Sequence, residues 1–350
     1  WFVSPEKADL AVETALAEER VLTGAPPGAA MVYLGVPFCP SRCAYCSFIA
    51  QDAMRQPDRL APYVDAVLHE TDLLFAKLKN ALPISAVYVG GGTPTSLPPG
   101  LLERLLQGVL TNLPLLPGAE LTIEAGRPDT ITAEKLTIIR AAGAGRLCIN
   151  PQTFHDRTLE RIGRQHNSAQ TREACYLARE MGFPSLNMDL IAGLSGETPE
   201  DFLQSLQETL DLGPDSITLH SLAMKRSSRL DQASRERGEH PGLPNPAFEE
   251  GLAAARKRLD QAGFKPYYLY RQKDVVGGLE NTGYARPGHE SIYNVGMMSD
   301  RRSIIGLGSG AMSKLVSGSR VERVPNLKDI AEYIRRSSEM AMRKINLFIG

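Results

Sequence analysis

The chain has 350 residues, of which 43% are hydrophobic and 23% are charged, and its formal net charge is −1. This composition is ordinary for a folded globular protein and excludes the disordered and fibrous classes. The balance of 39 basic and 40 acidic residues argues against a generally basic, nucleic-acid-binding surface. No apolar run approaches the roughly 20 residues of a membrane span, and no signal-peptide pattern opens the chain. We therefore expect a cytoplasmic protein.

The first 30 residues are predicted to form a helix and a linker, since Ser4 offers an N-cap and Pro5 suits the first helical position. Short apolar runs then alternate with helical segments, which is typical of parallel strands buried on both faces. The predicted strands are Met31–Val36, Ala86–Val89, Glu120–Glu124, Arg146–Ile149, Leu186–Ile191 and Ser216–Leu219. The predicted helices between them include Asp58–Asn80 and segments bracketed by Thr132 and Gly143, by Ser168 and Gly182, and by Thr198 and Gly213.

Six strand–helix units predict a parallel α/β fold. The pattern is compatible both with an incomplete barrel and with an open doubly wound sheet. The charged, Pro-rich stretch Asp231–Pro246 indicates a boundary. Beyond it, helix Phe248–Gly263 and strands Tyr267–Arg271 and Arg302–Leu307 suggest a smaller α+β module. We expect an N-terminal helix and linker at 1–30, a barrel domain at 31–230 and a C-terminal domain at 231–350.

Three of the five cysteines, Cys39, Cys43 and Cys46, crowd into the loop that leaves the first predicted strand. An odd count with such clustering argues against a disulfide scaffold and indicates thiolates that bind metal in a reducing compartment. A structural zinc requires four ligands, but no fourth cysteine follows nearby. An iron–sulfur cluster with one iron open to a non-protein ligand fits better, while zinc with distant ligands stays the alternative. The other two, Cys148 and Cys175, are predicted to be buried small hydrophobic residues.

Polar or side-chain-free positions recur where the predicted strands end. Three consecutive glycines, Gly90–Gly92, end the second strand and let the backbone approach a ligand closely. The third predicted strand ends at Glu124, and the fourth leads to Gln152. The fifth contains Asp189, and the sixth leads to His220. Because ligands bind at the carboxyl edge of parallel α/β sheets, we expect these residues to be functional. A hydrogen-bonded buried carboxylate is the structural alternative for Asp189.

The cysteine triplet followed by the segment 90–94 resembles the radical S-adenosylmethionine superfamily, and more closely its oxygen-independent coproporphyrinogen III oxidase group of HemN, HemZ and HemW. Further segments that match the group in order are 33–46, 89–97, 123–129, 150–154, 162–166, 187–194 and 306–314. The segments 124–128 and 222–226 are most similar to the HemZ branch, the coproporphyrinogen dehydrogenases. That branch usually has a further N-terminal region, so we expect the start at Trp1 to be truncated.

The resemblance implies a partial (β/α)6 barrel of the TIM type with a smaller C-terminal α+β domain. It implies one 4Fe-4S cluster held by Cys39, Cys43 and Cys46, with S-adenosylmethionine on the fourth iron, and it places Tyr33 and Glu124 in catalytic positions. The residues that match contacts to a first S-adenosylmethionine are Tyr33, Gly91, Glu124, Ala223 and Met312. Those that match contacts to a second molecule are Tyr45, Gly92, Thr93, Gln152, Arg164 and Asp189.

The implied reaction is the oxygen-independent oxidative decarboxylation of coproporphyrinogen III propionates to vinyl groups, yielding protoporphyrinogen IX in haem biosynthesis. We expect flavodoxin or ferredoxin as the electron donor, no nucleic-acid partner, and a monomer. A substrate with several carboxylates needs cationic anchors, for which Arg127, Lys225 and Arg226 are the candidates.

Two departures from the family pattern define the alternative function. HemN-type oxidases carry a further cysteine two positions after the third, where this chain has Phe48, as the haem-carrier branch HemW does. HemW also has a C-terminal His-Asn-x-x-Tyr-Trp segment, which this chain replaces with the segment Tyr293–Met298. A haem carrier with His289 as an axial ligand is therefore the alternative, and a zinc-stabilised, non-enzymatic module is the third reading.

Overall fold

The computed structural model describes residues 4–24, 26–46, 51–78, 82–222, 246–270 and 280–349. The α-helices are α1 (Pro5–Thr23), α2 (Leu60–Leu78), α3 (Pro99–Asn112), α4 (Ala133–Ala141), α5 (Asp156–Arg161), α6 (Ser168–Glu180), α7 (Pro199–Asp211), α9 (Pro246–Gln261), α10 (Ile292–Met298), α11 (Ile330–Arg335) and α12 (Ser337–Ile349). Short 3-10 turns are η1 (Pro57–Arg59), η2 (Pro94–Ser96) and η3 (Pro128–Thr130).

The strands are β1 (Ala30–Val36), β2 (Phe38–Cys39), β3 (Gln51–Asp52), β4 (Ile84–Gly91), β5 (Leu115–Gly126), β6 (Arg146–Gln152), β7 (Ser185–Ala192), β8 (Ser216–Ser221), β9 (Lys265–Tyr270), β10 (Asn281–Ala285), β11 (Ile304–Leu307), β12 (Met312–Ser317) and β13 (Arg320–Pro325). The main sheet has the order β13-β12-β11-β1-β4-β5-β6-β7-β8-β10-β9, and β2 pairs with β3 separately. Neighbouring strands from β1 to β8 in this order are parallel.

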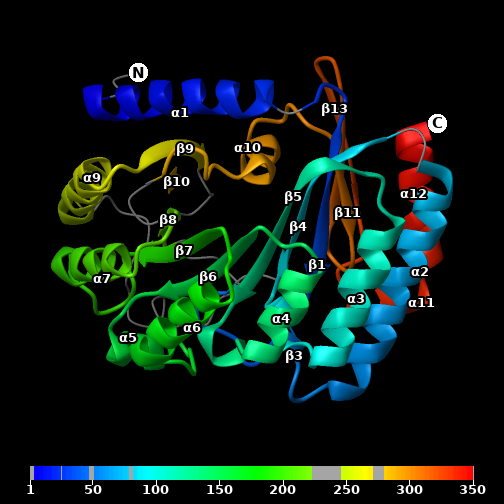
Figure 1. The fold of residues 1–350 in the computed structure, drawn as a ribbon, viewed down its shortest axis with the longest axis horizontal. Helices are drawn as coiled ribbons and strands as arrows, with labels where there is room; N and C mark the ends of the chain where they lie inside the picture. The colour runs from blue at the N-terminus through cyan, green and yellow to red at the C-terminus, as the bar shows by residue number, and fades with distance from the viewer. Residues whose placement is uncertain are drawn as a thin grey trace, which may run out of the picture.

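The six central strands form the partial barrel that the resemblance implies, with helices α2 to α7 outside it (Figure 1). Among the described residues β1 and β8 do not pair with each other, so the barrel stays open. All six strands deliver their carboxyl ends to one edge, because each returns through a crossover on the outer face. The predicted α/β fold class is confirmed.

The C-terminal part of the chain adds strands to both edges of this sheet. Strands β10 and β9 extend it antiparallel beyond β8, while β11 pairs parallel with β1 and leads to the antiparallel pair β12 and β13. The N-terminal helix α1 lies across β9 and α10, and α12 packs on α2 (Figure 1). Segments from both ends of the chain therefore pack against the central sheet and its helices.

Several local predictions are confirmed and two are corrected. The side chains of Ser4, Thr132 and Thr198 cap α1, α4 and α7 as predicted. Helix α6 is capped by Asn167 rather than Ser168, since the Asn167 side chain accepts the amide of the third helical residue in a capping box. Strand β5 begins at Leu115, five residues before the predicted start, because pairing with β4 outweighs the turn-forming Pro117-Gly118 sequence.

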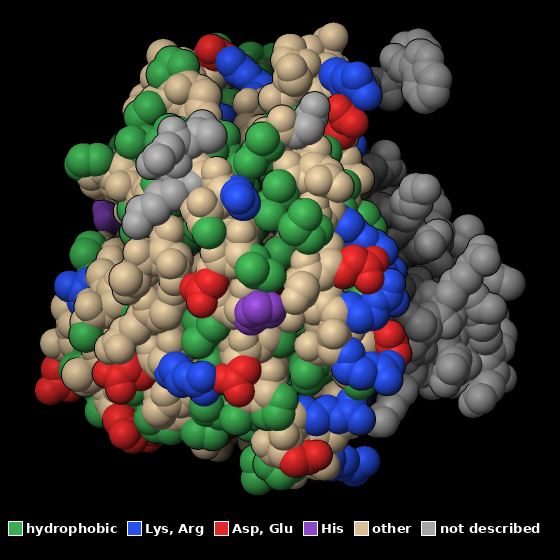
Figure 2. All heavy atoms as spheres, turned by 90° about the vertical axis from the view of Figure 1, so that its right-hand side faces the viewer, with side chains coloured by type: hydrophobic (Ala, Val, Ile, Leu, Met, Phe, Trp, Pro, Cys, Tyr) green, Lys and Arg blue, Asp and Glu red, His purple; other side chains and the backbone are tan. Residues whose placement is uncertain are grey.

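The main hydrophobic core lies between the sheet and its outer helices, and Cys148 and Cys175 are buried in the protein, as predicted. Figure 2 views the face formed by α2, α11 and α12, where acidic and basic side chains both occur and hydrophobic side chains lie between them. Within the described part of the chain, no helix is both long and apolar enough to cross a bilayer.

A buried ionic network fastens α12 to the sheet. Glu70 of α2 and Lys344 of α12 form an ion pair in which both side chains are fully buried. Glu70 also accepts hydrogen bonds from the Asn326 side chain (2.8 Å), the Tyr333 hydroxyl (2.7 Å) and the Gly308 amide (2.9 Å). The same carboxylate thus binds the C-terminal helices and the loop after β11.

We predict that Lys344→Met lowers the free energy of unfolding by about 3–5 kcal/mol, because it leaves the Glu70 carboxylate buried without its cation. Urea denaturation measures this. Arg343→Met is the matched control, since Arg343 is the neighbouring residue on α12 and its pair with Glu339 is exposed. The control should cost less than about 1 kcal/mol. Equal losses in the two variants would contradict a special role for the buried pair.

Candidate functional site

A cavity of about 540 Å³ opens at the carboxyl edge of the sheet. It is lined by strand ends, by the loop after β1 and by the segment that follows β11. The described residues predicted from the resemblance as cluster, S-adenosylmethionine or substrate contacts all contribute to its wall: Tyr33, Cys39, Cys43, Tyr45, Cys46, Gly91, Gly92, Thr93, Glu124, Arg127, Gln152, Arg164, Asp189 and Met312. Ala223, Lys225, Arg226 and Phe48 lie outside the described residues.

The cysteine loop is attached to the glycine segment of β4 through backbone hydrogen bonds. The Gly92 amide donates to the Val36 carbonyl (2.8 Å), and the Thr93 amide donates to the Phe38 carbonyl (2.7 Å). A Cβ at Gly92 would lie 2.5 Å from the Phe38 oxygen and 3.0 Å from the Cys39 sulfur. Glycine is therefore required at this position by close backbone approach, which is the role expected for the glycine run.

The three cysteines of the loop face one cavity and interact electrostatically. Burial raises the pKa of Cys39 to about 11, and charge repulsion from Cys46 and Cys43 acts in the same direction. A bound metal centre would instead lower the pKa of the cysteines, because it stabilises the thiolate form. Across the described ranges, no three His, Cys, Asp or Glu side chains form a group that could hold one metal ion. Three thiols on the wall of one cavity are the kind of donor set that an iron–sulfur cluster uses.

Glu124, at the end of β5, is the central carboxylate of the cavity. It accepts hydrogen bonds from the Tyr88 hydroxyl (2.9 Å) and the Gly91 amide (3.3 Å). Burial, together with the nearby charge of Asp189, raises the pKa of Glu124 to about 7. Glu124 can therefore accept a hydrogen bond from a cationic or hydroxyl-bearing ligand, and it can also hold a proton near neutral pH.

A second polar group lies beside the cysteines. The Arg164 guanidinium donates to the Tyr45 hydroxyl (3.0 Å) and to the Asn150 carbonyl (3.1 Å). Gln152 has a left-handed backbone with φ of 71°, which is unfavourable for a residue other than glycine and is found most often at functional sites. Within the described residues, Arg164 Nε and Gln152 Oε1 are buried without hydrogen-bond partners. These atoms fit a polar ligand that would satisfy them.

Asp189 lies close to a histidine on the neighbouring strand β8, and that histidine lies close to a tyrosine of β9. Its carboxylate accepts the Asn187 side-chain amide (2.7 Å) and lies 3.6 Å from His220 Nε2. The other ring nitrogen of His220 lies 3.3 Å from the Tyr270 hydroxyl. The sequence placed His220 at a strand end but gave it no role, and it did not connect Tyr270 to the site.

An aromatic wall was missed by the sequence analysis. Tyr33 and Tyr88 are register partners on β1 and β4, and their stacked rings have centroids 6.4 Å apart. Tyr293 of α10 stacks on Tyr88 at 4.7 Å. Parallel alignment of two strands could have suggested the first pair, but the addition of Tyr293 depends on tertiary packing alone. The wall offers a flat, apolar face to a ligand.

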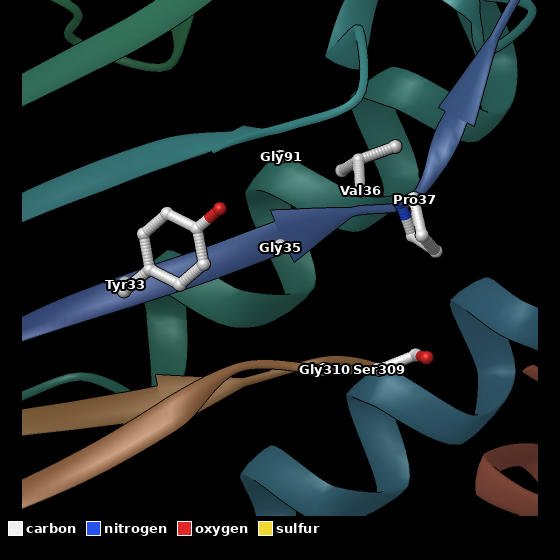
Figure 3. Close-up of a pocket in the computed structure, with 7 residues that line it drawn as sticks. All are labelled: Tyr33, Gly35, Val36, Pro37, Gly91, Ser309 and Gly310. Atoms are coloured by element: carbon white, nitrogen blue, oxygen red, sulfur yellow. The ribbon is translucent and has the colours of Figure 1, made fainter. Parts of the chain in front are cut away.

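A smaller cavity of about 60 Å³ adjoins the same strand end (Figure 3). Tyr33, Gly35 and Val36 of β1 line it together with Gly91, while Ser309 and Gly310 come from the segment after β11. Figure 3 shows the Tyr33 ring on the β1 side and the segment 309–310 opposite it. The C-terminal chain therefore forms part of the site, which agrees with the position of Met312 in the larger cavity.

Two sequence-predicted ligand residues are already engaged by other side chains. Arg127 is 2% exposed, and its guanidinium is bound to Asp129 and Ser41, so it is not a free cation for substrate carboxylates. His289 pairs with Asp215 at 3.9 Å and does not line the larger cavity. Sequence position alone cannot reveal which polar side chains are already engaged.

A family model described as the radical SAM superfamily matches residues 33–209. The chain is 38% identical over 318 residues to HemZ of Bacillus subtilis (strain 168), described as an oxygen-independent coproporphyrinogen-III oxidase-like protein. That match covers 90% of this chain but 63% of HemZ, so the chain spans less than two thirds of this relative. The haem chaperone HemW of the same organism is 30% identical over 307 residues, covering 86% of this chain and 75% of HemW.

Among solved structures, coproporphyrinogen III oxidase (HemN) from Escherichia coli superposes with a TM-score of 0.70 at 24% sequence identity. The match covers 92% of this chain and 72% of that chain. It shows that the two chains share a fold, including the partial barrel.

We predict that Gly92→Ala lowers the iron bound after anaerobic reconstitution well below about four per chain, the content of a 4Fe-4S cluster. The added methyl group would collide with the Phe38 carbonyl and the Cys39 sulfur. Gly100→Ala is the control, since a Cβ there meets no atom within 4 Å. Iron analysis and the visible absorption spectrum measure the outcome. Wild-type iron content in Gly92→Ala would contradict the close approach.

We predict that Glu124→Gln raises stability relative to the wild type more at pH 8 than at pH 5. The folded pKa of about 7 lies above the ordinary value of 4.5, so the folded state holds the proton more tightly. The resulting stabilisation is complete below pH 4.5 and is lost as the pH rises to about 7. Urea unfolding at both pH values tests this, with Glu103→Gln on the exposed face of α3 as control. A difference between wild type and Glu124→Gln that does not vary with pH would contradict the raised pKa.

Proposed function

The chain belongs to the radical S-adenosylmethionine superfamily and to its HemN, HemZ and HemW group, and from this premise we propose that it is an oxygen-independent coproporphyrinogen III dehydrogenase. In this reaction a propionate side chain loses a hydrogen atom, carbon dioxide and one electron, and a vinyl group remains. The observation that carries the proposal is the single cavity that joins three cysteines, two carboxylates and an aromatic wall.

Cys39, Cys43 and Cys46 are the residues that would hold the 4Fe-4S cluster, with S-adenosylmethionine on the remaining iron. When bound, the cluster and S-adenosylmethionine would supply the one-electron chemistry that removes the hydrogen atom from the substrate. The protein itself would bind and orient these groups and exclude water from them. A small one-electron carrier such as flavodoxin or ferredoxin would reduce the cluster.

The polar residues of the cavity divide into two groups with different chemistry. Glu124, bonded to Tyr88 and to the Gly91 amide, suits the ammonium or ribose hydroxyl groups of one S-adenosylmethionine. Arg164 suits a carboxylate, and the free Gln152 Oε1 suits a hydrogen-bond donor, as a second molecule would provide. Both sets coincide with the positions that match the family's contact residues.

The tetrapyrrole would lie against the aromatic wall formed by Tyr33, Tyr88 and Tyr293, where pyrrole rings can stack. Its carboxylates require cations. We retain Lys225 and Arg226 as candidates for these contacts, whereas the Arg127 guanidinium is engaged by Asp129 and Ser41.

A haem-carrying function is the second candidate, because HemW relatives match this chain over most of their length. It would need an axial ligand for haem. His289 is separated from the cavity wall and paired with Asp215, while His220 lines the cavity beside Asp189. Haem titration followed by absorption spectroscopy separates the two functions, since His220→Ala and His289→Ala would identify the ligand.

The test of the proposed reaction is anaerobic incubation of the reconstituted protein with dithionite, S-adenosylmethionine and coproporphyrinogen III. We expect vinyl products and 5′-deoxyadenosine from the wild type and only background from Cys43→Ala. Cys175→Ala is the matched control, because Cys175 is buried on α6 and does not line the cavity. A fully loaded wild type that cleaves S-adenosylmethionine but yields no vinyl product, and that binds haem, would support the carrier function instead.

A further inference from the structure

Arg127 lies directly behind the cysteine loop, at the end of β5. Its Nη1 atom is 3.7 Å from the Cys43 sulfur, 3.1 Å from the Ser41 hydroxyl and 3.4 Å from the Ser41 carbonyl. Arg127 as a whole residue is only 2% exposed, so its guanidinium is buried. It is therefore a buried, permanently charged donor that is directed at one of the three cysteines.

The opposite side of the guanidinium is fixed by a carboxylate. Nε and Nη2 of Arg127 donate to the two oxygens of Asp129 at 3.1 and 3.3 Å, a bidentate arrangement. Burial alone would raise the pKa of Asp129, but His166 and Arg127 outweigh it and hold the value at about 2. Asp129 stays ionised, so the guanidinium has one fixed orientation and Nη1 remains for the cysteine loop.

The loop segment that Arg127 contacts is also held from the other side. The Ser41 hydroxyl donates to the Gly163 carbonyl (3.2 Å), and the Ala44 amide donates to the Ile162 carbonyl (2.9 Å). The segment 41–44 is thus clamped between the end of β5 and the turn after α5. A shift of Arg127 would therefore affect Cys43 more directly than Cys39, whose sulfur is hydrogen-bonded to the Thr93 hydroxyl.

On the basis of the proposed function, we infer that Arg127 is a positioning residue that directs positive charge at the Cys43 sulfur and thereby raises the reduction potential of the cluster held by Cys39, Cys43 and Cys46. Reduction adds negative charge to a cluster. A nearby cation and a hydrogen bond to a ligating sulfur both favour the reduced form. Because Arg127 is buried, the surrounding water screens this charge only weakly.

This assignment differs from that of a substrate anchor. The Arg127 guanidinium already holds Asp129 in a bidentate contact and Ser41 through Nη1, so a substrate carboxylate would have to share it with both. The structure assigns the charge of Arg127 to the cysteine loop, where its effect exists without any substrate.

The test is an EPR-monitored redox titration of the anaerobically reconstituted full chain, without substrate or S-adenosylmethionine. We expect the midpoint potential of Arg127→Gln to be more negative than that of the wild type. Arg127→Lys keeps the charge and should restore part of the shift. Arg104→Gln, which removes an exposed arginine of α3 paired with Asp65, should leave the potential unchanged. EPR detects only molecules that contain a cluster, so partial loss of iron does not mask the shift.

An unchanged potential in Arg127→Gln, together with weaker coproporphyrinogen III binding, would overturn the inference and restore the anchor role. Loss of the cluster from Arg127→Gln but not from Arg127→Lys supports it, whereas equal loss from both variants contradicts it. A wild type that binds no cluster overturns this inference and the proposed function together. A shifted potential with no vinyl product supports the inference while refuting only the dehydrogenase activity.

Discussion

The site depends on the close backbone contact between the loop after β1 and the glycine end of β4. Two short hydrogen bonds, from Gly92 to Val36 and from Thr93 to Phe38, draw the cysteine loop over the edge of the sheet. No side chain can stand between them, since even a Cβ at Gly92 would overlap the Phe38 carbonyl. From this contact the cysteines face the carboxylates of later strands, and the cavity acquires its mixed thiol and acidic lining.

The C-terminal part of the chain is integral to that cavity. Its strands continue the sheet at both edges, and the segment after β11 reaches the carboxyl edge beside Gly35. The helix α10 lines the cavity from the amino ends of the strands, where Glu120 accepts hydrogen bonds from the Ile292 and Tyr293 amides. The buried Glu70–Lys344 pair holds this arrangement, because Glu70 binds both the C-terminal helices and the Gly308 amide. Stability and site geometry are therefore coupled through a pair that lies outside the cavity.

The cavity and the ion pair behind its cysteine loop hold charges in three distinct states. Glu124 carries a raised pKa because it is buried beside Asp189, while Asp129 carries a lowered one because His166 and Arg127 surround it. Arg127 has a constant charge that Asp129 orients. The carboxylate near the proposed ligand can thus change protonation near neutral pH, whereas the ion pair behind the cysteines cannot. Proton exchange is thus possible at Glu124 on the strand end, whereas the charge behind the cysteine loop stays fixed.

By itself the sequence determined the order of strands and helices, the cysteine triplet, the glycine run and the polar residues at the strand ends. Those features are local, because apolar periodicity, capping residues and motif spacing are written within a few residues of each other. The partnership of Tyr293 with Tyr88, the chain from Asp189 through His220 to Tyr270, and the engagement of Arg127 by Asp129 and Ser41 were decided only by tertiary structure. Most of these contacts join distant segments, and whether a polar side chain is free or already bound depends on the neighbours that folding brings to it.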